Sequence, residues 1–195
     1  MGLKQLLLSG LLLSVIEPLC AAISIDSLPD SSMVPGGVAV VLTGTEAISG
    51  SYRDERILLA DFDGEQYAII GIPLNASIGT HQFALELADG QRKLLQFSIE
   101  DKEYVEQHIA ITNERQVNPN ADDMVRINRE SAEMNRAFSS WDDSQTPVFG
   151  MRAPVQGVRS SSFGLKRFFN GQPRNPHSGM DIAADEGTPI YAPAP

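Results

Sequence analysis

Short hydrophobic runs, beginning with a β-branched run at residues 38–42, recur between residues 23 and 100, and the last two of them alternate with polar residues. Such runs predict strands, and alternation places every second side chain of a strand on one buried face. Turn pairs such as Asp63-Gly64 and Asp89-Gly90 separate them, as in tight hairpins. Short strands with tight turns are typical of an immunoglobulin-like β-sandwich, so the predicted fold class is mainly β. The five predicted strands cover residues 38–42, 57–62, 67–72, 81–87 and 94–99.

In the last two strands the buried face can be named residue by residue. The alternation assigns it to Phe83, Leu85 and Leu87, and then to Leu95, Phe97 and Ile99. Two histidines, His81 and His108, lie in or just beyond this region, where no cluster of residues has a catalytic pattern. We interpret each of them as a packing or surface residue.

The hydrophobic spacing becomes helical after residue 120. Asn120 is suited to cap a helix because its side chain can accept a hydrogen bond from the backbone of Asp123. We expect a helix over about 120–138, within a linker over 101–146 that also holds a strand around 109–112. The helix should act as a strut packed against one or both domains, or pair as a short coiled coil. Its apolar face would consist of Met124, Ile127, Met134 and Phe138, with Ser131 between them.

The N-terminus has the features of a secretory signal. Lys4 provides a positive start, and residues 6–15 form an apolar run too short for a membrane-spanning helix, which needs roughly 20 residues. Pro18 would break a helix, and the small residues before Ile23 permit cleavage after Ala22. We expect export, most simply to the periplasm, with residues 1–22 removed; an uncleaved segment that allows membrane association is the alternative.

Composition adds two constraints. Cys20 is the only cysteine, so a mature chain beginning after Ala22 has neither disulfides nor a cysteine nucleophile. Residues 23–143 hold nine basic and 21 acidic residues, whereas residues 144–195 hold five and three, so the net charge changes from −12 to +2. The change indicates a domain boundary. The basic part suits either an anionic substrate or a solvated loop, and the acidic remainder argues against nucleic acid.

Candidate metal chemistry lies near the C-terminus. His177 and Asp181 flank Ser178-Gly179, and imidazole and carboxylate are good zinc ligands. On a straight strand their Cα atoms would be about 13 Å apart, so binding one ion requires a sharp bend. Gly179 can supply it, because glycine tolerates a positive φ. A simple hydrogen-bonded pair is the alternative interpretation of the same two residues.

Three segments occur in order near the C-terminus. They are Ser161-Ser162-Phe163-Gly164, His177-Ser178-Gly179-Met180-Asp181 and Gly187-Thr188-Pro189-Ile190-Tyr191-Ala192. They resemble the opening of the lysostaphin-like (LytM-type) zinc metalloendopeptidase domain, and the resemblance covers about residues 147–195. It implies that His177 and Asp181 are zinc ligands, that the third ligand is a histidine of a later H-x-H motif, and that the substrate is the cross-linking peptide of peptidoglycan. Residues 23–100 then resemble an accessory domain.

No histidine lies between Asp181 and Pro195, so no residue of this chain is assigned a catalytic role, and the catalytic residues are expected downstream of Pro195. Two ligands without a base should bind zinc weakly, and we interpret the chain as an incomplete fragment of a longer enzyme. Its strands after residue 147, including one expected to begin at residues 188–191, should therefore lack partners. The alternatives are a non-catalytic wall-binding or regulatory protein with a degenerate LytM-type domain, and an adhesive or scaffolding β-sandwich protein.

The first prediction concerns export. Protein recovered from the periplasm should begin at Ile23, because the apolar run is short and cleavage after Ala22 follows it. N-terminal sequencing or intact-mass measurement checks this. A mature protein that still begins at Met1 would instead establish the anchored form.

Overall fold

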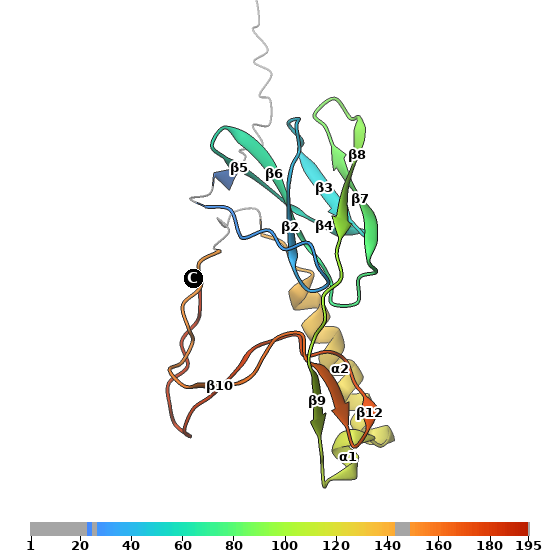
Figure 1. The fold of residues 1–195 in the computed structure, drawn as a ribbon, viewed down its shortest axis with the longest axis vertical. Coiled ribbons are helices and arrows are strands. Elements are labelled where there is room, and N and C mark those ends of the chain that lie inside the picture. The colour runs from blue at the N-terminus through green and yellow to red at the C-terminus, as the bar shows by residue number, and fades with distance from the viewer. Residues whose placement is uncertain (1–22, 25–26, 143–148, 195) are drawn as a thin grey trace, which may run out of the picture.

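The computed structural model describes residues 23–24, 27–142 and 149–194 (Figure 1). It is mainly β, as the sequence predicts. The expected cleavage point after Ala22, the expected start of the second domain at residue 147, and Pro195 lie outside the described residues. Among the residues described, no helix combines the length and apolar character needed to cross a membrane.

Two four-stranded sheets form the N-terminal half of the molecule. The five predicted strands are all present, as β2, β5, β6, β7 and β8. The first sheet has the order β1 (Ile23–Ser24), β5 (Leu58–Phe62), β6 (Glu65–Gly71), β2 (Val38–Leu42). The second has the order β4 (Glu55–Arg56), β3 (Ser49–Tyr52), β7 (Gly79–Glu86), β8 (Arg92–Ile99).

The hydrophobic core lies between these sheets. Phe83 and Leu85 of β7 are buried in it with Phe97 and Ile99 of β8, and Leu87 and Leu95 pack at its margin. The face predicted from the alternation is thus the face that is buried. From the opposite sheet the core receives Ala39, Ala68 and Ile70. Apolar residues from both layers therefore close a sandwich.

Strand β3 was not predicted, because its residues Ser49–Tyr52 offer no hydrophobic alternation. The strand forms by pairing with β4 and β7, and Gly50 is the position at which the core lies closest to it. A Cβ on Gly50 would lie 2.8 Å from Ile57 and 3.2 Å from Leu85. The core therefore approaches the backbone of β3 itself, and any larger side chain would displace it.

The linker contains β9 (Glu106–Ile109), α1 (Glu114–Val117) and α2 (Ala121–Phe138). The predicted strand around 109–112 thus begins earlier and ends at Ile109. Helix α2 starts where expected, with the predicted capping box between Asn120 and Asp123. Its packing differs from the prediction, however. No residue of α2 is buried, and Phe138 is 85% exposed, so the apolar face expected for the strut is not buried against the described part of the chain.

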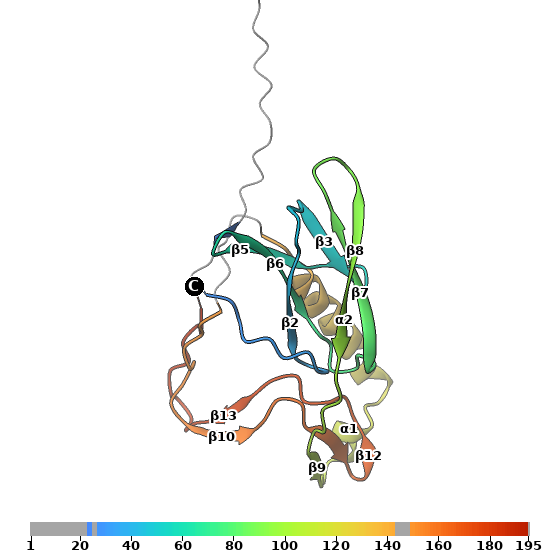
Figure 2. The ribbon, with the colours of Figure 1, turned by 45° about the horizontal axis from the view of Figure 1, so that its top comes forward.

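The C-terminal residues form two small sheets (Figure 2). In the first, β11 (Lys166–Phe169) pairs antiparallel with β12 (Gln172–Pro173) and parallel with β9. In the second, β10 (Val158–Ser161) pairs with β13 (Asp181–Ala183). The expectation that strands after residue 147 lack partners is wrong for the four described strands, because β10 pairs with β13, β11 pairs with β12, and the linker supplies β9 as a second partner of β11. The strand expected at residues 188–191 is also absent; two isolated backbone hydrogen bonds join residues 191–193 to residues 152–154.

Tyr104 connects the sandwich to the C-terminal part. Its hydroxyl donates to the carbonyl of Pro35 over 2.7 Å, and its ring meets Phe163 edge-on at 6.5 Å between centroids. A Cβ on Gly164 would lie only 1.9 Å from this ring, and Gly164 has φ +87°. The Ser161-Ser162-Phe163-Gly164 segment is therefore a turn that fits against Tyr104.

The second prediction tests the sandwich core. Leu85→Ala should lower the free energy of unfolding by about 2–5 kcal/mol, because the leucine is fully buried. Leu94→Ala is the matched control, since Leu94 is 58% exposed and should change stability by about 0.5 kcal/mol or less. Urea unfolding of both variants measures the difference. Equal losses would contradict the assignment of the core to this face of β7 and β8.

Candidate metal-binding site

The backbone of His177 is fixed opposite the turn at Gly164. Its N–H donates to the carbonyl of Leu165 over 2.9 Å, and its carbonyl accepts from the N–H of Gly164 over 2.7 Å. Asp181 begins β13 and lies across from Ser161 of β10, next to an irregularity in the pairing. The turn before β11 therefore places His177, and the β10–β13 pair places Asp181.

The bend expected between the ligands occurs at Gly179, although not by the expected means. Gly179 is not among the glycines with positive φ, so its backbone conformation is open to other residues. Its position suggests another reason for a small residue. A Cβ on Gly179 would lie 3.7 Å from Nε2 of His177, so a longer side chain would crowd the nitrogen that faces Asp181.

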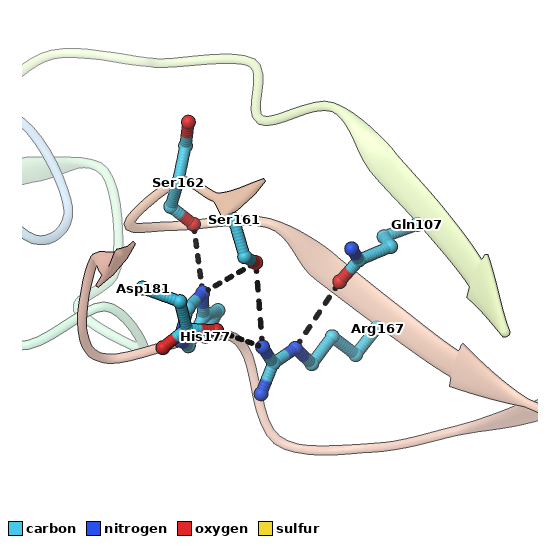
Figure 3. Close-up of polar contacts among 6 residues, drawn as sticks. All are labelled: Gln107, Ser161, Ser162, Arg167, His177 and Asp181. Carbon is cyan, nitrogen blue, oxygen red and sulfur yellow. Dashed lines mark hydrogen bonds and ion pairs between the residues drawn. The ribbon is translucent and has the colours of Figure 1, made fainter. Parts of the chain in front are cut away.

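The imidazole of His177 is buried, with 8% of its side chain exposed. Its Nδ1 lies 2.9 Å from the carbonyl oxygen of Ser162 and 3.0 Å from Oγ of Ser161 (Figure 3). A carbonyl oxygen can only accept, so Nδ1 carries the proton and donates it. A neutral imidazole held in this way directs the lone pair of Nε2 outward.

That lone pair faces a carboxylate. Nε2 of His177 is 3.2 Å from Oδ1 of Asp181, and two electron-rich atoms at this distance require a proton or a cation between them. Two ligands of one tetrahedral zinc ion, each about 2.0–2.1 Å from it, are about 3.3 Å apart. The observed separation and the donor types thus fit zinc, and the same separation fits the direct hydrogen bond that is the alternative interpretation of this pair.

The described arrangement brings together two candidate ligands. Within the described part of the chain, no set of three or more His, Cys, Asp or Glu residues is gathered to hold a metal. The catalytic residues are expected downstream of Pro195, so the structure places none of them. That expectation stays a prediction.

Two side chains that the sequence did not single out complete the arrangement. Arg167 of β11 contacts Oδ2 of Asp181 and Oγ of Ser161, each over 3.4 Å from Nη2. Its Nε donates to Oε1 of Gln107 on β9 over 3.2 Å. Figure 3 shows the guanidinium between the site and the linker strand. In the sequence, Arg167 was visible only as one of the positive charges of the basic stretch, residues 152–174.

Most of that basic stretch is engaged within the chain. Arg152 donates to the carbonyl of Ala192, and Arg174 donates to the carbonyl of Val117. Together with Arg167, these residues serve internal contacts. The basic residues left most open to an anionic substrate are the exposed Arg159 and Lys166.

The other histidines have the packing or surface roles predicted for them. His81 accepts or donates one hydrogen bond with the Tyr52 hydroxyl at 2.8 Å and another with Ser77. His108 is exposed and stacks on Phe168 with 4.6 Å between ring centroids. Neither joins the His177 site.

An acidic hollow of about 440 Å³ lies elsewhere, on the sandwich beside Thr43, Glu46 and Asp61. Burial raises the pKa of the Asp61 carboxyl, and the charge of Glu46 raises it further. This hollow is formed by the β5–β6 end of the sandwich and contains neither His177 nor Asp181, so it is separate from the candidate metal site.

Comparison with known proteins links both halves of the chain to peptidases. Residues 31–102 match the peptidase family M23 N-terminal domain. The chain also resembles the crystal structure of a candidate M23 peptidase from Pseudomonas aeruginosa, with 31% identity and a TM-score of 0.63. That match covers 84% of this chain and 60% of the other, so the chain spans less than two thirds of that protein. These findings support the assignment of the chain to the M23/LytM peptidase family.

Two further comparisons add nothing to this assignment. A Bacteroides ovatus protein, SGBP-B of a mixed-linkage glucan utilization locus, shares 16% identity over 47% of this chain and 26% of its own. Its TM-score of 0.27 is too low to support an argument. No curated protein matches the chain in sequence.

The third prediction tests the turn that holds His177. Gly164→Ala should cost about 1–2 kcal/mol for the left-handed backbone and about 1–3 kcal/mol more for the overlap with Tyr104. Gly171→Ala isolates the first term, because Gly171 has φ +77° with open space around its Cα. Denaturant unfolding, with hydrogen exchange at residues 164–177, measures both variants. The same cost in both would show that Tyr104 does not pack against Gly164.

Proposed function

We propose that the protein is a zinc-dependent endopeptidase of the M23/LytM type that hydrolyses the peptide cross-links of bacterial peptidoglycan. The observation that carries the proposal is the 3.2 Å approach of His177 Nε2 to Asp181 Oδ1. It occurs within a motif that resembles the family's metal-binding segment, downstream of a region matched by the family's N-terminal domain.

The donor set supports zinc as the metal. His177 would bind it through Nε2 and Asp181 through an oxygen, while the hydrogen bond from Nδ1 to Ser162 keeps the imidazole in the required tautomer. A zinc ion bound there would supply a water of lowered pKa and would polarise the scissile carbonyl. The resemblance assigns the third ligand to an H-x-H motif that would lie beyond Pro195.

The proposed organisation follows the sequence boundaries. Residues 1–22 would direct export to the periplasm, 23–100 would form the accessory sandwich, 101–146 the linker, and 147–195 the first part of the peptidase domain. The sandwich carries the M23 N-terminal match, which supports its assignment as an accessory domain. Peptidoglycan, reached in the periplasm, would be the partner.

The fourth prediction concerns the metal ligands in the full-length protein. His177→Ala and Asp181→Ala should each abolish tight zinc binding and the release of peptides from purified peptidoglycan, because each removes one of three ligands. Zinc titration against a chromophoric chelator and chromatography of the released fragments measure the two effects.

Two controls accompany this experiment. His108→Ala removes an exposed histidine outside the site, and Ser162→Ala retains the backbone carbonyl that accepts from His177; both should preserve zinc binding and hydrolysis. Full activity in either ligand variant would overturn the assignment. A wild-type protein that binds peptidoglycan without zinc and without cleavage would favour the non-catalytic alternative.

A further inference from the structure

We propose that Arg167 is a positioning residue for the metal site. It holds one oxygen of Asp181, so that only the other oxygen is free to bind the metal. The inference rests on the proposed function, because it concerns the same site. It assigns a role to a side chain outside the ligand motif and to the linker strand that supports it.

Each oxygen of the Asp181 carboxylate faces a different neighbour. Oδ1 of Asp181 faces Nε2 of His177 at 3.2 Å, whereas Oδ2 faces Nη2 of Arg167 at 3.4 Å. The final torsion of an aspartate is soft and nearly two-fold, so an unrestrained carboxylate can rotate and present either oxygen or both. Arg167 removes this freedom by engaging one oxygen.

The same guanidinium group reaches the second ligand indirectly. Nη2 of Arg167 lies 3.4 Å from Oγ of Ser161, and that oxygen lies 3.0 Å from Nδ1 of His177. The hydroxyl can accept from both, because it has two lone pairs. One side chain therefore contacts the carboxylate directly and the imidazole through a single hydroxyl group.

Strand β9 holds Arg167 in turn. Gln107 is the register partner of Arg167 in the parallel pair, and its Oε1 accepts from Nε over 3.2 Å. The guanidinium is planar and rigid, so fixing Nε also fixes the direction in which Nη2 points. The linker strand thus orients Arg167, and Arg167 orients the carboxylate of Asp181.

Stability alone does not explain the arrangement. Asp181 is 52% exposed and Arg167 is 24% exposed, and ion pairs in such partly solvated settings contribute little to stability. Orientation of Asp181 is therefore the role that we assign to the pair. The charge of Arg167 would also repel a bound cation, so metal affinity combines two opposing effects. The coordination of the metal is the more direct readout.

The fifth prediction uses the full-length protein loaded with cobalt(II) in place of zinc. In Arg167→Ala the freed carboxylate should bind through both oxygens, raise the coordination number and lower the visible absorption per cobalt several-fold. Arg167→Lys should restore part of the wild-type spectrum, because its ammonium group can still reach Oδ2. Arg159→Ala is the matched control, since it removes an exposed arginine from β10 and should leave the spectrum unchanged.

A second variant keeps the test valid if Arg167→Ala fails to fold. Gln107→Leu leaves both charges and removes only the support of Nε, and it should shift the spectrum in the same direction by a smaller amount. Zinc affinity, measured in parallel, should fall by up to about 10–100-fold in Arg167→Ala, as for other residues that orient metal ligands.

The outcomes separate the two proposals. A wild-type cobalt spectrum in Arg167→Ala, or in Gln107→Leu where the first variant does not fold, would overturn the positioning role while leaving the metal site intact. Failure of the wild-type protein to bind cobalt or zinc at all would overturn the proposed function, and the positioning role with it.

Discussion

The parallel pairing of β9 with β11 is the interaction on which the geometry of the candidate site depends. Four residue pairs form it, from Lys166 with Glu106 to Phe169 with Ile109, and backbone hydrogen bonds extend it at both ends. Without β9, strand β11 would have only the two-residue partner β12. The pairing also sets Gln107 beside Arg167, so the same ladder determines both the position of the backbone and the direction of the guanidinium group.

The remaining restraints act on the segment between β11 and β13. The Asn170-Gly171 turn, with φ +49° and +77°, reverses the chain after β11, as expected for a two-residue hairpin. Asn170 also hydrogen-bonds both backbone groups of Ile111 on the linker. Tyr104 then fills the space above Gly164. Local turn chemistry and one aromatic contact thus bring His177 to the end of β10, where Asp181 is its neighbour.

The sequence predicted the parts that depend on local patterns. Alternation revealed β7 and β8 with the correct buried face, and the pair Asn120 and Asp123 revealed the start of α2. His177 and Asp181 were found because ligand types and spacing are visible in the sequence, and the structure brings their side chains together. Their role as metal ligands stays a prediction.

What the sequence missed depends on contacts between distant residues. Gln107 and Arg167 are 60 positions apart, so no periodicity relates them, and β9 was placed several residues too late. Strand β3 was missed because close packing around Gly50 replaces the usual hydrophobic signal. The apolar face of α2 predicted a helix packed against a domain, yet its residues are exposed. A hydrophobic stripe shows that a helix has a face suited to packing, but it does not identify what packs against it.

The separation of β9 from β11 has a consequence for the order of folding. During synthesis β9 emerges well before its partner, so its edge stays unpaired until the intervening chain has followed. An open hydrophobic edge would attract other chains, but β9 has the sequence Glu-Gln-His-Ile and is polar at three of four positions. Its charged and polar side chains protect this edge until β11 arrives. The strand that positions the site is thus also one that can remain unpaired without associating with other chains.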